Sequence, residues 1–145
     1  MTIYDMMMLE GFNKIQKKRY WFLRQALSFL NTPYKLGGQD GEDIDCSGLV
    51  TVSLQAIGLL PMNRDYDCDA LWKHFQFYPK PRVPNPACIV FWCDSSEDYK
   101  HVAISLDDEH CISATGYDKY NRSVRIHPLN YRDGDGLEKK IVDPF

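Results

Sequence analysis

The sequence predicts an α+β fold, in which N-terminal helices pack on an antiparallel β-sheet. Apolar residues recur at helical spacing before residue 58, whereas short apolar runs separated by polar turns fill the chain after residue 86. Helices therefore come before strands, an order typical of α+β domains. A chain of 145 residues can bury about two-thirds of its unfolded surface, so we expect a single domain over 1–145.

Apolar periodicity predicts two longer helices and one short one. The first covers about residues 10–31, where an apolar stripe runs up to the break at Pro33. The second is expected over 47–57, where four apolar residues share one face before Gly58, a typical C-terminal stop. The stretch CDALWKHF, residues 68–75, predicts the short third helix.

Five short apolar segments predict the strands of the sheet. Each is bounded by polar turn residues, as expected for neighbouring strands of an antiparallel sheet. They cover residues 87–93, 101–106, 110–114, 123–127 and 139–143.

Charge and hydropathy argue against two classes of function. The formal net charge is −3, with 17 basic and 20 acidic residues, which is unlike a protein that binds nucleic acid through phosphate contacts. No run reaches the eighteen or so apolar residues that span a bilayer. The first residues lack the basic start and long apolar core of a signal peptide, so we expect synthesis in the cytoplasm.

The cysteine pattern predicts free thiols, with no metal and no cofactor. Five cysteines form an odd set, which argues against a full disulfide framework. No CxxC pair is present, so the usual ligand spacing of a structural zinc site is missing. Cys88 and Cys111 lie in strand-like runs and are expected to be small core residues.

The stretch IDCSGLVT, residues 44–51, makes Cys46 the candidate nucleophile. Cys46 lies at the predicted front of the second helix, where partial positive charge lowers a thiol pKa. The thiolate is the attacking form, and backbone N–H groups at the same helix front can hold an oxyanion. Asp45, just before the thiol, is also a candidate helix N-cap.

Four histidines are candidates for the general base. His101 opens the predicted strand 101–106, so its ring can project from the sheet edge toward a packed helix. His74 is expected to pack or face solvent, His110 to occupy a turn, and His127 to lie near a strand end. His101 is therefore the preferred partner of Cys46.

These residues resemble a known family. The stretch TPYKLGGQDGEDIDCSGLV is similar to the nucleophile motif of the NlpC-type cysteine peptidases, papain-like bacterial cell-wall endopeptidases. VPNPACIVFW resembles the strand before their histidine, and HVAISLDDEHCISATG resembles their histidine strand, hairpin and following strand. The resemblance covers about residues 20–127, and implies a papain-like fold.

The resemblance also implies the reaction and its residues. Family members cleave peptidoglycan stem peptides, typically between D-glutamate and a diamino acid. Cys46 would be the nucleophile and His101 the base, while Tyr34 would help bind the oxyanion or substrate. Asp45 and Ser47 would lie where the family contacts the free amine of the stem peptide.

Two departures from the family pattern stand out. The strand before the histidine usually begins Gly-Asp, and here it begins Ala87–Cys88. The third polar residue, which orients the histidine, is usually His, Asn or Gln, whereas the alignment puts Ser113 there. His110 is three residues from Ser113, so in a strand it would point to the opposite face.

Three functions stay open at this point. The first is the wall peptidase, delivered by a phage tail, a lysis system or another partner, because no secretion signal is recognised. The second is a papain-like amidase or acyltransferase with another substrate, since fold does not fix substrate. The third is a structural or binding protein of a phage tail that has lost turnover.

Overall fold

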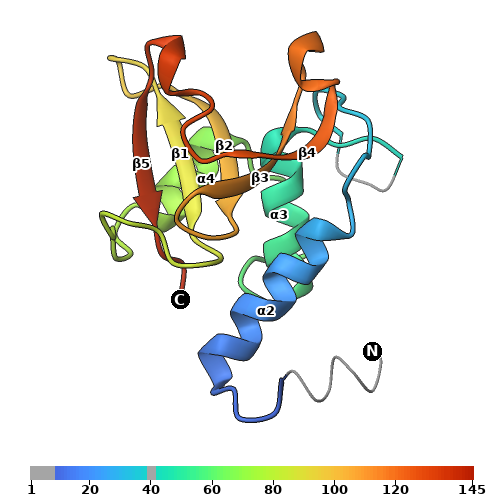
Figure 1. Cartoon of the computed structure of the whole chain (residues 1–145), viewed down its shortest axis with the longest axis vertical. Helices are drawn as coiled ribbons and strands as arrows, with labels where there is room; N and C mark the ends of the chain where they lie inside the picture. The colour runs from blue at the N-terminus through green and yellow to red at the C-terminus, as the bar shows by residue number, and fades with distance from the viewer. Residues whose placement is uncertain (1–8, 39–41) are drawn as a thin grey trace.

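The computed structural model describes residues 9–38 and 42–145. Residues 1–8 of the expected domain and 39–41 of the predicted loop before Cys46 lie outside this range. Within it, three α-helices gather beside a five-stranded antiparallel sheet (Figure 1). The helices are α2 (Lys14–Leu27), α3 (Cys46–Ala56) and α4 (Cys68–Phe75). The α+β fold expected from the sequence is confirmed.

All five predicted strands are present. They are β1 (Ile89–Cys93), β2 (Tyr99–Ser105), β3 (His110–Thr115), β4 (Ser123–Pro128) and β5 (Glu138–Val142). Their order across the sheet is β4-β3-β2-β1-β5, so the C-terminal strand pairs with β1 at one edge. Single 3-10 turns at Asp118–Tyr120 and Asp133–Asp135 interrupt the connections on either side of β4.

Helix α2 is shorter than the predicted span of residues 10–31. It begins at Lys14 because Asn13 caps it, accepting from the N–H of Gln16 while the Gln16 side chain accepts from the N–H of Asn13. It ends at Leu27, and the following residues form turns up to a bridge at Pro33. Apolar periodicity alone therefore overestimated this helix at both ends.

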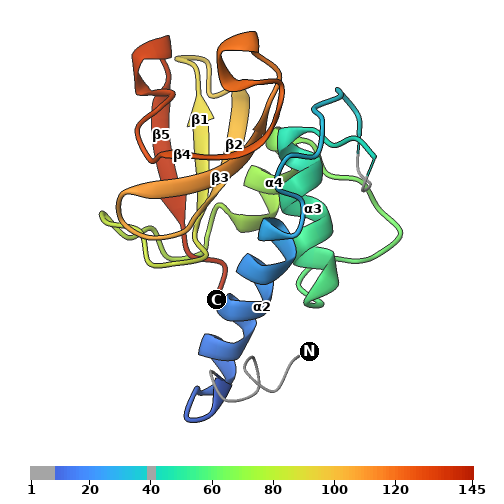
Figure 2. The same ribbon diagram turned by 45° about the vertical axis from the view of Figure 1, so that its right-hand side comes forward.

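The sheet has apolar residues on both faces. One face carries the larger cluster with α3 and α4, including Phe91, Val102 and Ile112. The other face carries a smaller cluster around Val90 and Trp92. Leu129, Tyr131 and Leu137 from the segment between β4 and β5 pack on this second cluster together with Ile141 of β5, whereas α2, α3 and α4 lie together beside the sheet (Figure 2).

Ala87 explains one departure from the family pattern. Its φ is +72°, in the left-handed region that glycine prefers, and it is fully buried just before β1. The family pattern has a glycine here, and the backbone of Ala87 adopts the conformation that glycine prefers. Left-handed backbone at a residue other than glycine costs about 1 kcal/mol or more.

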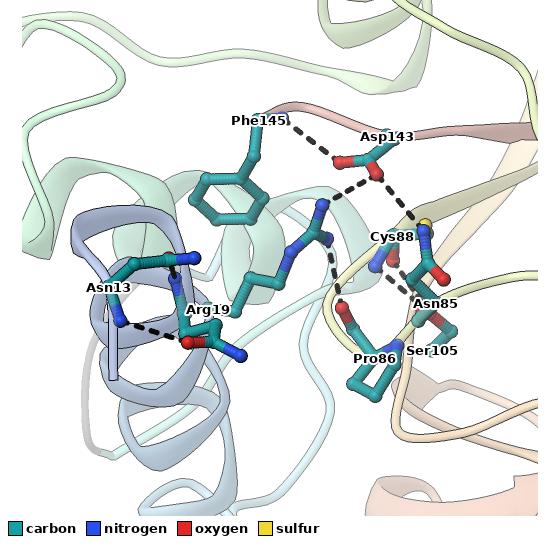
Figure 3. Close-up of polar contacts among 9 residues, drawn as sticks. Asn13, Arg19, Asn85, Pro86, Cys88, Ser105, Asp143 and Phe145 are labelled. Atoms are coloured by element: carbon teal, nitrogen blue, oxygen red, sulfur yellow. Dashed lines mark hydrogen bonds and ion pairs between the residues drawn. The ribbon is translucent and has the colours of Figure 1, made fainter. Parts of the chain in front are cut away.

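A buried ion pair joins α2 to the end of the chain (Figure 3). Arg19 Nη2 lies 2.6 Å from Asp143 Oδ2, and Arg19 Nη1 donates to the Pro86 carbonyl at 3.1 Å. The guanidinium also lies 4.7 Å from the ring centre of Phe145. The side chains of Arg19 and Asp143 are only 19% and 10% exposed, so removing one partner leaves the other charge poorly solvated.

Arg19→Met should destabilise the protein by about 2 kcal/mol, measured by urea unfolding. The loss arises because Asp143 keeps a buried charge with one fewer donor. Lys17→Met, at an exposed position of the same helix, is the matched control and should change stability by less than about 0.5 kcal/mol. If the two substitutions lower the stability equally, the ion pair does not stabilise the packing of α2.

Candidate active site

Asp45 builds the front of α3 and ties it to the preceding loop. It is the N-cap of the helix, and its Oδ1 accepts from the Gly48 N–H at 2.6 Å. Its Oδ2 accepts from the Gly37 N–H at 2.7 Å. Both carboxylate oxygens are thus used by the backbone, so Asp45 has the N-cap role that its position suggested. Cys46 is the first residue of α3.

Two glycines allow the loop and the helix to approach closely. A Cβ on Gly48 would lie 2.3 Å from the Gly38 carbonyl oxygen and 2.8 Å from Asp45 Oδ1. A Cβ on Gly38 would lie 2.6 Å from Asp43 Oδ1. Side chains at these positions would therefore collide with backbone and with the cap, which gives a physical reason for the glycines around the thiol.

The Cys46 thiol has a strongly lowered pKa. The largest cause is a hydrogen bond with Cys68, whose sulfur lies 3.7 Å away. The charge of His101 and hydrogen bonds with its side chain and with the Val102 backbone add to the effect, against the opposing effect of burial. Cys68 keeps its proton, because the neighbouring Cys46 and burial raise its pKa. The site therefore favours a thiolate at Cys46.

His101 lies within β2, facing Trp92 on the neighbouring strand. The strand begins at Tyr99 and not at His101 as expected, because Tyr99 pairs with Cys93 across an irregularity in the β1–β2 ladder. The His101 ring is almost fully buried, and its centre lies 5.4 Å from that of Trp92. This packing leaves the imidazole little room to turn.

Two hydroxyl groups meet the Nε2 atom of His101. Ser113 Oγ lies 2.8 Å from it, and the Tyr131 hydroxyl lies 2.5 Å from it. Ser113 Oγ also donates to the Val102 carbonyl at 3.2 Å, which leaves a lone pair to accept from Nε2–H. The Tyr131 hydroxyl is 2.9 Å from Thr115 Oγ1. With Nε2 occupied in this way, Nδ1 is the ring nitrogen available to the thiol.

Tyr34 and Ser47 line the same cavity as Cys46. The cavity measures about 230 Å³, and its wall includes Tyr34, Asp45, Cys46, Ser47 and Cys68. Burial and the nearby charge of Cys46 raise the pKa of Tyr34 to about 12, so its hydroxyl stays protonated and can donate. Ser47 is mostly buried, and its Oγ donates to Asp45 Oδ1 at 3.3 Å.

The other histidines lie apart from the thiol. His110 is exposed, with Nδ1 3.1 Å from Asp107 Oδ1. His74 lies in α4 and packs edge-on against Tyr66. His127 is buried and stacks on Tyr131 at 4.1 Å between ring centres, and burial lowers its pKa to about 4, so it is neutral.

Tyr131 and Cys68 are the site residues that the sequence analysis missed. Tyr131 lies in the turn-rich stretch after β4, and Cys68 begins the short helix α4. They lie 30 residues after His101 and 22 residues after Cys46 respectively, so no local pattern connects them to the site. The only sequence signal for Cys68 was its place directly after Asp67, the N-cap of α4, which matches the place of Cys46 after Asp45.

No metal-binding group was found among residues 9–38 and 42–145: no three His, Cys, Asp or Glu side chains are arranged as ligands. The five cysteines are free thiols. In the same part of the chain, none of the helices has the length and apolar character needed to cross a bilayer.

The comparisons assign the family. The model of the NlpC/P60 family matches residues 31–132, which is more than half of the chain and includes every predicted site residue. The chain therefore belongs to the NlpC/P60 family. No curated protein is similar enough in sequence to match it.

Solved structures support the same fold. The NlpC/p60 domain of the peptidoglycan hydrolase SagA is 21% identical, with a TM-score of 0.63, and the match covers 86% of this chain and 97% of that one. The peptidoglycan hydrolase RipB from Mycobacterium tuberculosis is 18% identical, with a TM-score of 0.69, covering 94% and 70%. An NlpC/P60 family protein from Bacillus cereus is 19% identical, with a TM-score of 0.68. That match covers 86% of this chain but only 39% of the Bacillus cereus protein. The protein thus has the papain-like fold of NlpC/P60 peptidoglycan hydrolases.

Gly48→Ala should destabilise the protein by about 3 kcal/mol, because the new methyl group would overlap the Gly38 carbonyl and the Asp45 cap. Urea unfolding measures this. Gly134→Ala is the matched control, since its added methyl meets nothing within 4 Å, and it should be close to neutral. Similar behaviour of the two variants would contradict the close approach of loop and helix.

Proposed function

We propose that the protein is a cysteine peptidase that hydrolyses peptidoglycan stem peptides, at the bond between D-glutamate and the diamino acid. The observation that carries the proposal is the arrangement of Cys46 at a helix front, with its pKa lowered by His101 and Cys68. That arrangement meets the physical requirement for a thiol nucleophile, namely a stable thiolate beside a proton carrier.

Attack by Cys46 on the scissile carbonyl would form a tetrahedral oxyanion. The front of α3 offers backbone N–H groups outside the helical ladder, and Tyr34 offers a protonated hydroxyl on the same cavity. The His101 imidazolium would then give its proton to the leaving amine, leaving an acyl-enzyme at Cys46. Water activated by the neutral imidazole would release the acid and restore the thiolate.

Ser113 would orient His101, with Tyr131 as an additional positioning residue. Accepting from Nε2–H fixes the tautomer in which Nδ1 exchanges a proton with the thiol. Serine is shorter than the His, Asn or Gln usual at this position, and the Tyr131 hydroxyl makes up for it on the same nitrogen. Thr115 in turn holds the Tyr131 hydroxyl.

The surroundings of the thiol suit a charged peptide. A second cavity of about 310 Å³ adjoins the first, and both are lined by Tyr34 and Lys100. Asp67 and Asp69 line the first cavity, and Arg132 lines the second. Carboxylates on the first cavity, Arg132 on the second and Lys100 on both match a substrate that carries both amines and carboxylates. SagA and RipB are peptidoglycan hydrolases with this fold, which supports the same substrate class.

Digestion of purified peptidoglycan, followed by mass spectrometry of the fragments, tests the proposal. New termini at D-glutamate and at the diamino acid are expected, and Cys46→Ala should produce none. Release of ammonia, or transfer to an added amine without new termini, would instead indicate an amidase or acyltransferase. Binding to peptidoglycan without turnover would indicate a structural protein. Delivery by a phage tail or lysis system stays a prediction.

Cys46 should be alkylated at a lower pH than an ordinary thiol. A lowered pKa means that the thiolate is present at any pH above that lowered value, so iodoacetamide should label Cys46 at a pH well below the pKa of about 8.5 of a free cysteine. The buried Cys88 and Cys111, whose pKa values are raised, should stay unlabelled. Peptide mapping measures the order of labelling. His101→Ala should move the labelling of Cys46 to higher pH, and no such shift would exclude His101 as its partner.

Ser113→Ala and Tyr131→Phe should each lower kcat/KM about 10-fold, and the double variant about 10³-fold. The double loss exceeds the product of the single losses because either hydroxyl can hold Nε2 when the other is absent. Tyr131→Phe keeps the ring stacked on His127. Tyr120→Phe is the control, because it removes a nearby hydroxyl that contacts the Tyr131 carbonyl and not His101. A double variant no worse than Ser113→Ala would rule out positioning by Tyr131.

A further inference from the structure

The candidate nucleophile has a second thiol beside it. Cys46 and Cys68 are the first residues of α3 and α4, and their sulfurs lie 3.7 Å apart. Both side chains line the cavity of about 230 Å³ that would receive the substrate. Hydrolysis by a thiolate–imidazolium pair needs only one reactive cysteine, and a hydroxyl could also donate a hydrogen bond to its thiolate, so the mechanism does not explain why the neighbour is itself a thiol.

We propose that Cys46 and Cys68 form a modification site, at which a hydroperoxide oxidises the two thiols to a reversible intramolecular disulfide. The chemistry depends on the geometry of the pair and not on peptidase activity. Only its consequence, reversible loss of hydrolysis, rests on the proposed function. A disulfide here would consume the nucleophile and place the Cys68 sulfur where the scissile carbonyl must approach.

The geometry lies close to that of a disulfide. An S–S bond is about 2.05 Å long, so the sulfurs must approach by about 1.7 Å. Each cysteine occupies the first turn of its helix, where side-chain rotation does not disturb the helical hydrogen bonds behind it. Among the described residues, no other two cysteine sulfurs are hydrogen-bonded to each other.

The reaction balances in two steps. The Cys46 thiolate attacks the peroxide, so the O–O bond breaks, an S–O bond forms and the leaving hydroxide takes the proton held by His101 to become water. Cys68 then attacks the sulfenic sulfur, so an S–S bond forms, the S–O bond breaks and the second hydroxide leaves with the Cys68 proton. Two electrons pass from the two sulfurs to the peroxide, and a dithiol reductant returns them.

Electrostatics favours this order of events. In the reduced state the neighbouring Cys46 keeps Cys68 protonated. Oxidation turns the Cys46 thiolate into a neutral sulfenic acid, which removes the negative charge that opposed ionisation of Cys68. The second thiol therefore ionises more readily once the first has been oxidised, although burial still opposes its ionisation.

The test treats the whole protein with hydrogen peroxide and follows intact mass and peptide maps, which require no enzymatic activity. We expect the wild type to lose two hydrogen atoms in mass, with the peptides that contain Cys46 and Cys68 joined, and dithiothreitol to restore the original mass. Cys68→Ser lacks the resolving thiol, so Cys46 should instead be oxidised past the sulfenic acid to a sulfinic or sulfonic acid, a gain of two or three oxygen atoms that dithiothreitol does not remove. Cys111→Ser, at a buried strand position, is the control and should behave as the wild type.

The rate at which Cys46 is oxidised irreversibly gives a second measure. Irreversible oxidation of Cys46 should be at least about tenfold faster in Cys68→Ser than in wild type, because the disulfide protects the sulfur from further oxidation. A wild type that gains oxygen at the same rate as Cys68→Ser, or a disulfide mapped to any other pair, would overturn the proposal. A reversible disulfide in a protein that digests no peptidoglycan would uphold the modification site and refute the proposed function.

Discussion

The site depends on the two hydrogen bonds that the Asp45 carboxylate accepts from the backbone. One oxygen holds Gly48 at the front of α3, and the other holds Gly37 in the loop that carries Tyr34. Helix front, loop and thiol are thereby fixed as one unit. The loop and the helix front approach so closely that a Cβ on Gly48 would overlap the Gly38 carbonyl, and a Cβ on Gly38 would overlap Asp43. The glycines of the motif are thus a requirement of packing as much as of chemistry.

The second half of the site depends on the register of one hairpin. Ile104 pairs with Ile112 across β2 and β3, and continuing this antiparallel register sets Thr115 opposite His101. Ser113, two residues before Thr115, therefore lies on the same face of the sheet as His101. This register positions Ser113, which contacts Nε2 directly, and Thr115, which contacts the Tyr131 hydroxyl that also meets Nε2.

The environment of Cys46 combines opposing effects. Burial raises its pKa, while Cys68, His101 and the Val102 backbone lower it more strongly. Such a balance suits a nucleophile that is shielded from bulk water yet ionised. It also makes the sulfur the most readily oxidised of the five, so a neighbouring thiol that forms a reversible disulfide would protect it. The contact between the Cys46 and Cys68 sulfurs would then both lower the pKa of the nucleophile and protect it from irreversible oxidation.

The sequence alone determined the features that local patterns carry. Helical and strand periodicity predicted α3, α4 and all five strands, and the resemblance to the family predicted Ser113, 12 residues after His101, as the partner of the histidine. The tertiary structure decided the rest. Tyr131 reaches His101 only because the connection after β4 folds over the second face of the sheet, and Cys68 meets Cys46 only because two helix fronts converge. Contacts between segments so distant along the chain leave no periodic trace, since they depend on how whole elements pack.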